Sequence, residues 1–382
     1  MKIIFKRQEI MNKIAPLMSV VSGKSTISAA DGILIEANET DKCMMTAYDI
    51  EKGIKITVDA EVIEQGSYII NAQKFNQTLK VMNGDEITLT VDNKLNAVFE
   101  CGKSSHKTLA LKAEDFPQIP DLTSEKGFVV NQATLKKMLS KVSYAMGINE
   151  PRPVLNGCFI KTEEGMINVV ACDGFKLAVC SAESDLKKLE NSEKGVEFSF
   201  IVPVKSVNEI VKLLSDDEED IVTVYMSHKN MVLAFEDLTF FTSLIVGEFV
   251  DYNRIIIKNH KIEVVASKDA LLASLEKASL ITEEKIAGSV RSHVKIDVAE
   301  DLFKVSAVSS VGSIYDEFNV EHSGDDISIA FNNRFLIDSI RACRSENVKL
   351  SMSSPLMGIN IEPCDEESGT ELFMLLPVRT RD

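Results

Sequence analysis

Three segments of the chain place apolar residues at helical spacing after a polar first turn. They are RQEIMNKIAPLMSVVS from Arg7, NQATLKKMLSKVSYAMG from Asn131 and SKDALLASLEKASLI from Ser267. Met11, Leu135 and Leu271 occupy equivalent places in them, 124 and 136 residues apart. Apolar positions three and four residues apart are typical of a helix with one buried face, so each segment is predicted to be helical.

A second trio of segments interleaves with the first. Its members are INAQKFNQTLKVMNGDEITLTV, IVPVKSVNEIVKLLSDDEEDIVTVYM and AFNNRFLIDSIRACRSENVKLSMS. Each predicts a helix, a polar turn and an alternating strand, and the alternating positions are Ile87-Leu89-Val91, Ile221-Thr223-Tyr225 and Val348-Leu350-Met352. The helices start at Asn71, Pro203 and Asn332, which are 132 and 129 residues apart.

Both trios have one period, which indicates a unit of about 130 residues present three times. Helices are predicted at 6–24, 71–82, 131–147, 203–214, 267–281 and 332–344. Short apolar strands such as GILIEANE, KCMMTAYD and ISIAF lie between them. Such strands indicate antiparallel sheets with helices packed on one face, an α+β fold. Turn-rich stretches near 119–127 and 246–254 give domains 1–122, 127–247 and 248–382.

The end of the sequence, ELFMLLPVRTRD, contains an apolar run from Leu372 to Leu376 that is followed by a proline. Free termini are normally polar, whereas an apolar run of this length bounded by proline favours a short buried strand. We therefore expect another part of the fold to cover this segment.

Charge is distributed unevenly along the chain of 382 residues. The whole sequence carries a formal charge of −16, which by itself argues against a partner as anionic as DNA. The six predicted helices, however, contain 16 Lys and Arg against 5 Asp and Glu. Either helix surfaces simply favour Lys, or the helices line one common basic surface beneath an acidic exterior. The chain has no Trp, which favours sequence-independent phosphate contact over base stacking.

Seven scattered cysteines without a Cys-x-x-Cys pair indicate reduced core thiols in a cytoplasmic protein. Lys6, Arg7 and Glu9 interrupt the N-terminal apolar stretch that a signal peptide needs, and no window has the length of a membrane span. We therefore expect a cytoplasmic location and no membrane partner.

The sequence offers little catalytic chemistry. SGKST, with Lys24, resembles the end of a phosphate-binding loop, but Met18 stands where that loop needs a glycine. The five histidines lack the spacing of a metal site, and no nucleophile elbow is present. The Asp-Gly of CDGFKLAVC is interpreted as a hairpin turn between two apolar strands. We predict no active site, no metal and no cofactor.

The ordered set TAYDIEKGIK, NAQKF, EDFPQIP, RPVLNG, ACDGFKLAVC, EFVDYNRII, FNNRFLIDSI and MLLPVR resembles the bacterial DNA polymerase III beta subunit, the sliding clamp family, over the whole chain. The resemblance implies three clamp domains per subunit and a head-to-tail homodimer that closes a ring around duplex DNA. It implies a non-enzymatic processivity factor. It also implies a hydrophobic cleft between the second and third domains, where the replicative polymerase, the clamp loader and repair polymerases insert peptide motifs.

By that resemblance, the peptide-binding cleft consists of Leu155, Cys172, Gly174, Phe175, Lys176, Leu177, Val250, Arg254, Ile255, Ile286, Asn332, Phe335, Leu356, Gly358, Met374, Leu375, Leu376, Pro377, Val378 and Arg379. Phe175 stands where relatives often carry a basic or imidazole side chain, and Val250 stands where proline is common. The ligand preference is therefore expected to differ from that of relatives.

Family positions near DNA match Lys24, Gln73, Asn149 and Arg152, and the basic helix adds Lys136, Lys137 and Lys141. The subunit interface is predicted at His106, Thr108, Leu280 and Ile281. His106 and Thr108 replace apolar residues of some relatives, which reduces the apolar area available there.

Two other functions are compatible with parts of the sequence. One is a repeat-built scaffold that binds peptides but not DNA, and retention on DNA separates it from a clamp. The other is a nucleotide-dependent enzyme that uses Lys24, which nucleotide binding lost in Lys24→Ala would support.

Overall fold

The computed structural model describes residues 1–21, 28–124, 126–163, 165–183, 187–188, 197–227, 229–282, 293–310, 312–365 and 370–379. The chain forms two compact units. The first comprises Met1–Gln132, Lys187–Gly195 and Glu219–Leu244, and the second comprises Ala133–Leu186, Val196–Glu218 and Ile245–Asp382. In the part of the chain that the structure describes, no helix is long and apolar enough to span a bilayer.

The six predicted helices are confirmed, although α3 ends at Val142 and not at 147, and the expected end of the first helix at 24 lies outside the described residues. They are α1 (Arg7–Val20), α2 (Ala72–Val81), α3 (Gln132–Val142), α4 (Val204–Leu213), α5 (Lys268–Thr282) and α6 (Asn333–Ala342). Asn71 and Asn332 explain two of the starts, because their side chains accept hydrogen bonds from the backbone N–H of Lys74 and Phe335.

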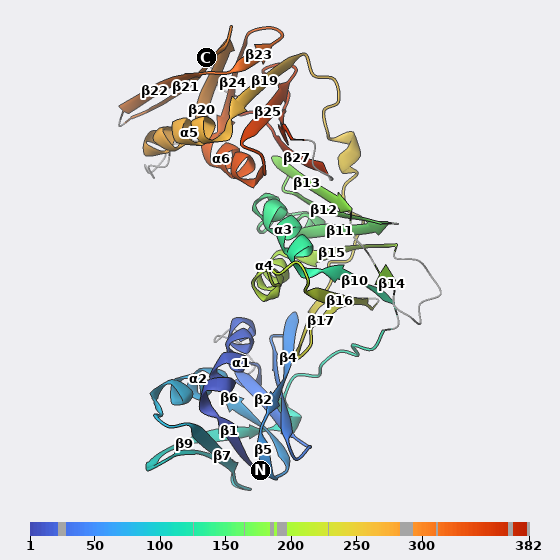
Figure 1. Ribbon diagram of the computed structural model, residues 1–382, viewed down its shortest axis with the longest axis vertical. Helices are drawn as coiled ribbons and strands as arrows, with labels where there is room; N and C mark the ends of the chain where they lie inside the picture. The colour runs from blue at the N-terminus through green and yellow to red at the C-terminus, as the bar shows by residue number, and fades with distance from the viewer. Residues whose placement is uncertain are drawn as a thin grey trace. The chain divides into compact units, whose positions relative to one another are not determined.

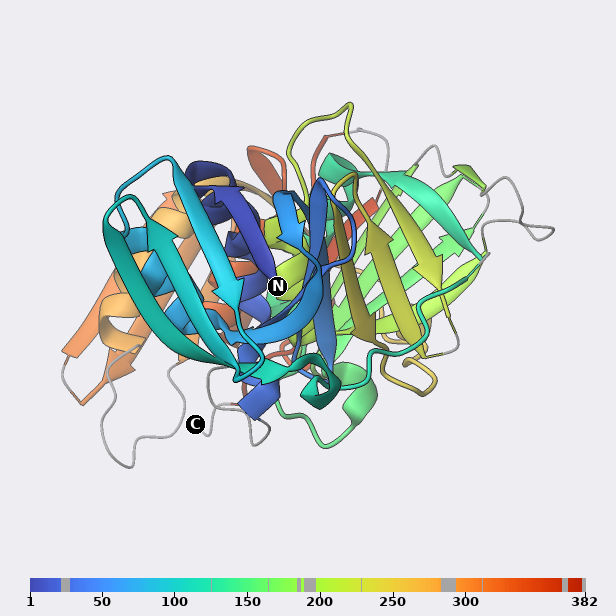
Figure 2. The same cartoon turned by 90° about the horizontal axis from the view of Figure 1, so that it is seen from below.

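One antiparallel sheet of fourteen strands organises the first unit. Its order is β14 (Lys187–Lys188), β10 (Gly127–Asn131), β16 (Ile221–Met226), β17 (Asn230–Ala234), β18 (Leu238–Ser243), β4 (Lys52–Asp59), β3 (Lys42–Tyr48), β2 (Gly32–Ala37), β6 (Gly66–Asn71), β9 (Ser104–Lys112), β8 (Asn96–Cys101), β7 (Glu86–Val91), β1 (Lys2–Lys6) and β5 (Glu61–Glu64). Figure 2 shows the blue strand β4 beside the olive strand β18. We call this β4–β18 pairing the first junction.

Helices α1 and α2 pack against each other, and α1 also packs on β3 and β4 (Figure 1). The buried face of α1 carries Ile10, Ile14 and Leu17, which recur every three to four residues. Helix spacing therefore sets which residues enter the core, as the sequence predicts.

Two antiparallel sheets organise the second unit. The larger runs in the order β15 (Phe198–Pro203), β11 (Gly157–Glu163), β12 (Met166–Cys172), β13 (Lys176–Glu183), β27 (Thr370–Leu375), β26 (Ile359–Pro363), β25 (Asn347–Met352), β19 (Ile262–Ser267) and β23 (Glu321–Ser323). The smaller contains β22 (Gly312–Asn319), β21 (Leu302–Ser309), β20 (His293–Ala299) and β24 (Ile327–Asn332). We call the β13–β27 pairing the second junction.

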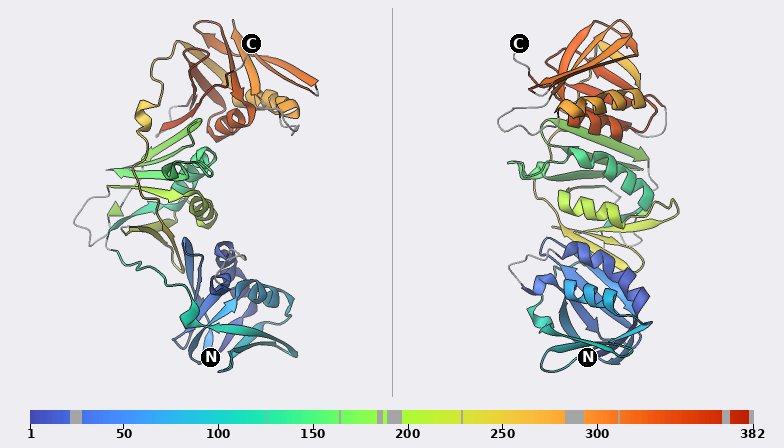
Figure 3. Two further views of the ribbon diagram at one scale, coloured as in Figure 1. Left: turned by 180° about the vertical axis from the view of Figure 1, so that it is seen from behind. Right: turned by 90° about the vertical axis from the view of Figure 1, so that its left-hand side faces the viewer.

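Helices α5 and α6 lie side by side in the second unit (Figure 3). The buried amide of Asn333 joins them: its Nδ2 donates to the Leu275 carbonyl at 3.0 Å, Ser279 Oγ at 3.0 Å and Thr282 Oγ1 at 3.1 Å. One polar side chain thereby fixes how the two helices pack.

Several local predictions have definite outcomes. Leu372 to Leu375 of the C-terminal apolar run lie in β27, which is buried between two strands as expected, whereas Leu376 follows the strand and is exposed. In β16 the buried positions are Val222 and Val224, whereas Ile221 is exposed. All seven cysteines are free, and six are buried, but Cys364 is exposed, so the prediction of a core thiol is wrong there.

The strand order also bears on the domain boundaries. At the first junction, strands from both sides of the predicted boundary at 122–127 belong to one sheet. At the second junction, strands from both sides of the boundary at 247–248 belong to another. The boundaries at 1–122, 127–247 and 248–382 stay predictions.

Candidate functional site

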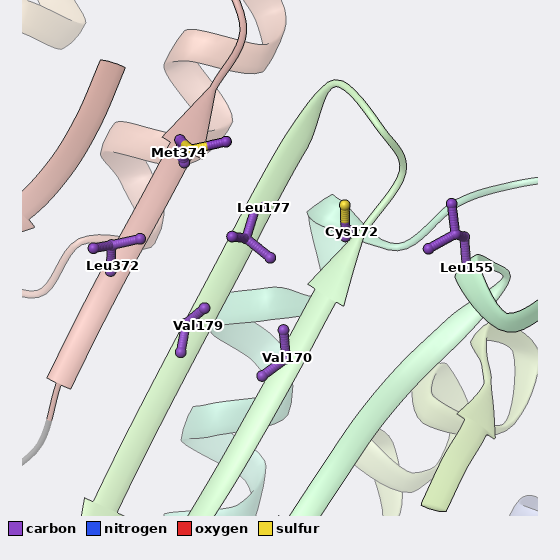
Figure 4. Packing of buried hydrophobic residues seen from close by; sticks show 7 residues of the cluster. All are labelled: Leu155, Val170, Cys172, Leu177, Val179, Leu372 and Met374. Atoms are coloured by element: carbon purple, nitrogen blue, oxygen red, sulfur yellow. The ribbon is translucent and has the colours of Figure 1, made fainter. Parts of the chain in front are cut away.

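The second junction carries a cluster of buried apolar side chains (Figure 4). The cluster contains Leu155, Val170, Cys172, Leu177, Val179, Leu372 and Met374. Val179 lies opposite Leu372 across the ladder, and Leu177 lies opposite Met374, so their side chains share one face of the sheet. Four predicted cleft residues, Leu155, Cys172, Leu177 and Met374, are thus brought together.

The connecting segment before β19 packs on this cluster. Phe249, Val250, Tyr252, Ile256 and Ile257 are its partly buried contacts. Phe249 stacks on Phe159 with ring centroids 5.0 Å apart and planes 5° apart. Val250, one of the predicted cleft residues, therefore packs on the same cluster as Leu177 and Met374. Phe249 was missed, although the equivalent Phe116 of EDFPQIP packs on the cluster at the first junction and provides a repeat-based signal.

A tight turn between β12 and β13 forms one end of the cluster. Asp173 Oδ1 accepts hydrogen bonds from the backbone N–H of Phe175 and Lys176, both at 2.9 Å. Gly174 has φ +91°, a conformation that side chains with a Cβ disfavour. The Phe175 side chain is 61% exposed, and its carbonyl accepts a hydrogen bond from Leu376 at 2.8 Å. The interpretation of Asp-Gly as a hairpin turn is confirmed.

Lys176 is buried, and internal partners satisfy its ammonium group. Its Nζ lies 2.7 Å from Asp173 Oδ2, donates to the Tyr144 carbonyl at 2.8 Å and lies 4.7 Å from the centre of the Phe335 ring. Because its charge is neutralised on the face of β13 opposite the cluster, Lys176 supports the fold there and offers no free cation to a ligand.

Cys172 behaves as a small apolar residue in this cluster. Burial raises the pKa of its thiol, and the hydrogen bond that its Sγ accepts from the Gly174 N–H at 3.4 Å opposes that rise only in part. The thiol is therefore protonated near neutral pH.

Five apolar residues from four segments of the second unit are exposed. They are Phe175, Ile255, Leu356, Met357 and Leu376. Leu356 is 77% exposed, and Phe175 and Leu376 are joined through the backbone hydrogen bond described above. Buried apolar residues with exposed apolar neighbours are typical of a surface that binds another molecule. Met357 was not predicted.

The remaining cleft residues divide by what their side chains do. Met374 and Leu375 are buried in β27, whereas Leu376 and Arg379 are exposed. Pro377 is partly buried, and the Val378 N–H donates to the Ala330 carbonyl at 2.8 Å. Residue 358 has to be a glycine, because a Cβ there would lie only 2.9 Å from the Leu375 carbonyl oxygen.

Three further cleft predictions have other outcomes. The Asn332 side chain caps α6, so it acts on the local fold. The Arg254 side chain is exposed, and its Nε lies 2.9 Å from Asp251. Ile286 lies outside the described residues.

The first junction has a turn built in the same way. Asp49 Oδ1 accepts hydrogen bonds from the N–H groups of Glu51 and Lys52 at 3.0 and 2.8 Å, and Ile50 has φ +80° where the second turn has Gly174. Here the Phe241 ring occupies the space above Gly53, so a Cβ on that glycine would overlap the ring. The aromatic ring therefore fills the position that corresponds to Leu177.

The predicted DNA residues differ in how free their side chains are. Gln73, Lys137, Asn149 and Arg152 are exposed. Lys136 lies 2.6 Å from Asp216, and Lys141 pairs with the buried Glu371. Arg152 lies 3.7 Å from the place a Cβ of Gly174 would occupy, which puts it beside the cleft turn. Lys24 lies outside the described residues.

The predicted interface residues lie at two sheet edges. In β9, residues 104–109 pair with β8 alone, because β6 pairs only with 110–112. His106 is exposed and contacts Thr78 Oγ1 at 2.9 Å, whereas Thr108 is buried. In the second unit β22 ends its sheet, and α5, which carries the exposed Leu280 and half-buried Ile281, packs on it.

Among the described residues, no group of three His, Cys, Asp or Glu side chains could hold a metal ion. The chemistry available at the second junction is that of apolar burial and backbone hydrogen bonding.

Three family models match the chain in consecutive order. They are the N-terminal, central and C-terminal domains of the DNA polymerase III beta subunit, which match residues 1–120, 129–251 and 253–377.

Curated and solved proteins are similar over their full length. The beta sliding clamp of Chlamydia pneumoniae is 28% identical over 384 residues, with 100% of both chains covered. A crystal structure of a putative DNA polymerase III beta subunit from Eubacterium rectale has a TM-score of 0.92 at 23% identity, and that of the beta subunit from Thermotoga maritima has 0.86 at 26%. Both cover 100% of each chain.

Proposed function

The chain belongs to the DNA polymerase III beta subunit family, and we propose on that basis that it is a sliding clamp that tethers the replicative polymerase to duplex DNA. The main support is that all three domain models of this subunit match one chain in order and almost without gaps. The clamp is a processivity factor and catalyses no reaction.

Charge segregation supports contact with duplex DNA. The six helix segments are basic, whereas the chain as a whole carries −16. Exposed Gln73, Lys137 and Asn149 are the proposed contacts, together with Lys24 and Arg152. Lys136 can contact a phosphate only if its ion pair with Asp216 breaks. Lys141 pairs with the buried Glu371 and is not proposed as a DNA contact. Few, sequence-independent phosphate contacts permit sliding, whereas many would hold the protein in place.

The cluster at the second junction supports a peptide-binding cleft. Its buried side chains offer a floor, and the exposed Phe175 and Leu376, which flank β13 and β27, offer anchoring surface. An extended peptide with a few apolar side chains fits such a site, because a few buried anchors supply most of the binding energy. The proposed ligands are motifs of the polymerase, the clamp loader and repair polymerases in the cytoplasm.

Two unpaired strand edges support a head-to-tail ring. One is β9 at residues 104–109, which carries Lys107 and the exposed Leu109, and the other is β22, which carries the exposed Glu317. The neighbouring Asp316 pairs with Lys277 of α5 at 2.8 Å. Edge strands expose unpaired backbone groups, so opposite charges on two such edges favour their pairing between subunits. We therefore place the interface at these edges, together with His106, Thr108, Leu280 and Ile281.

Retention on circular plasmid tests the function. With a clamp loader and ATP, the protein should stay on circular DNA through a moderate-salt wash and run off once the plasmid is cut, because a ring is held by topology. Bound protein is measured by gel filtration before and after linearisation.

A contrary result would be equal release from circles and linear DNA, governed by salt alone. The basic helices would then merely bind phosphate, and the peptide-binding scaffold would be the better description.

A further inference from the structure

Strand β27 contributes to the cleft with one face and contacts helices with the other. Leu372 and Met374 belong to the cleft cluster. Glu371 and Phe373 point to the opposite face, since side chains alternate along a strand. The Phe373 ring lies 6.3 Å from the ring of Tyr144, whose hydroxyl donates to Ser339 Oγ on α6.

Glu371 is the one charged residue of β27, and only 4% of it is exposed. Its carboxylate pairs with Lys141 Nζ on α3 and accepts from the backbone N–H of Arg344 at 3.2 Å and from Arg344 Nη1 at 3.4 Å. Arg344 Nε also donates to Asp365 Oδ1 at 2.9 Å. Two cations and two carboxylates therefore connect α3, β27 and the segments that follow α6 and β26.

The network contains no further ionised partner from the neighbouring strand. Cys180 lies opposite Glu371 on β13, and burial, followed by the charge of Glu371, raises its pKa to about 11. The thiol is neutral near pH 7, so it adds no charge to the network that Glu371 forms with Lys141 and Arg344.

Apolar patterning alone does not determine how β27 pairs with its neighbours. The four residues from Leu372 to Leu375 are all apolar and all buried, on both faces of the strand. A slip by one residue would exchange the two faces without exposing an apolar side chain. It would, however, move Glu371 into the apolar cluster and away from both cations, which is strongly unfavourable for a buried charge.

We propose that Glu371, held by Lys141 and Arg344, is the positioning residue that sets the register of β27 and so directs Leu372 and Met374 into the peptide-binding cleft. The proposal rests on the proposed peptide-binding function of the second junction. It also gives Lys141 a role inside the fold, in place of contact with DNA.

The first junction provides a matched control. Lys13 of α1 pairs there with Asp237, immediately before β18, but both side chains are substantially exposed. Strand β18 also has threonines at positions 239 and 242 to distinguish its faces. An exposed pair beside a strand with polar positions is not needed to set register.

The test measures binding of a fluorescein-labelled peptide from the polymerase tail by fluorescence anisotropy. Glu371→Gln should weaken binding at least tenfold, because β27 then populates other registers, whereas Asp237→Asn should change it less than twofold. If Glu371→Gln folds poorly, the double variant Glu371→Gln/Lys141→Met removes the unpaired lysine and should bind as weakly.

A cross-strand disulfide separates register from general stability. Ser181 and Thr370 lie opposite each other at the start of the β13–β27 ladder, outside the cleft cluster. Cysteines at both positions should bridge in the native register and restore peptide binding to the Glu371→Gln variant until dithiothreitol is added.

The outcomes are distinct. A bridge that forms without restoring affinity, or undiminished affinity in both Glu371 variants, overturns the proposal. Absence of peptide binding by the unaltered protein would instead contradict the proposed function of the second junction.

Discussion

Gly174 and Ile50 occupy equivalent positions in two turns and adopt a similar backbone conformation, although they are very different residues. Both have φ near the left-handed region, at +91° and +80°. In each turn an aspartate accepts two backbone hydrogen bonds and pairs with a lysine three residues later, at 2.7 Å for Asp173 and 2.8 Å for Asp49. The hydrogen bonds to the aspartate carboxylate hold each turn, and they impose positive φ on the next residue even where that residue is Ile50.

Gly174→Ile should destabilise the second turn by about 1–2 kcal/mol, because a β-branched residue disfavours positive φ. It should also displace Phe175 and weaken binding of the labelled polymerase tail peptide. The reverse change at the equivalent position, Ile50→Gly, is the control and should leave peptide affinity unchanged. Thermal unfolding and anisotropy measure the two effects, and equal loss of affinity in both variants would contradict this account.

Residue roles were predictable only where local sequence determines them. The Asp-Gly turn at Asp173 follows from local chemistry. The partner of Lys141 does not, because Glu371 is 230 residues away and joins it only through tertiary packing. Arg152 illustrates the same limit: its position beside Gly174 depends on how two segments fold together.

At the scale of elements, the helices were predictable because their apolar spacing is a local property. The buried face of β16 was less so, since either Ile221 or Val222 could begin the apolar face. The surrounding sheet selects Val222 and Val224 and leaves Ile221 exposed. Tertiary context thus determines strand faces whose alternate positions are both apolar.

Asn333→Ala should loosen the packing of α5 on α6. The change removes an amide nitrogen that has two N–H donors and lies within hydrogen-bond distance of three acceptors, and it leaves the Leu275 carbonyl without that donor. At roughly 1 kcal/mol for each of two hydrogen bonds, the expected loss is about 2 kcal/mol.

Asn332→Ala, one residue earlier, removes only a helix cap and should cost about 1 kcal/mol. Denaturant unfolding, followed by amide exchange in α5 and α6, compares the two. A smaller effect for Asn333 than for Asn332 would show that the buried amide does not join the helices.

At the scale of the whole molecule, the internal repeat predicted three similar domains with two helices each, and the family models and structural neighbours confirm this fold. The strand pairings at the two junctions could not be predicted. Each joins segments nearly 200 residues apart, such as Gly53 with Phe241 and Leu177 with Met374, which no local pattern reveals.

Leu109→Asp should convert the proposed dimer into a monomer. Leu109 is 70% exposed, so the chain should still fold, but the new charge would face the acidic β22 edge of the next subunit. Sedimentation analysis should then give the 42.2 kDa mass of one chain.

Ile63→Asp is the matched control, because Ile63 is also exposed and lies on the other edge strand, β5. It should leave the mass of the dimer unchanged. A dimer that persists in Leu109→Asp would place the subunit interface elsewhere.

The phenylalanine at the first junction also bears on how many partners the proposed ring would bind at once. Phe241 fills the space above Gly53 at the first junction, so we place the proposed peptide site at the second junction of each chain, and the proposed two-subunit ring would carry two such sites. Two partner proteins would bind the proposed ring at the same time, and a third would bind only after one of them dissociates. Exchange among partners therefore becomes a competition for occupancy, decided by local concentration and residence time.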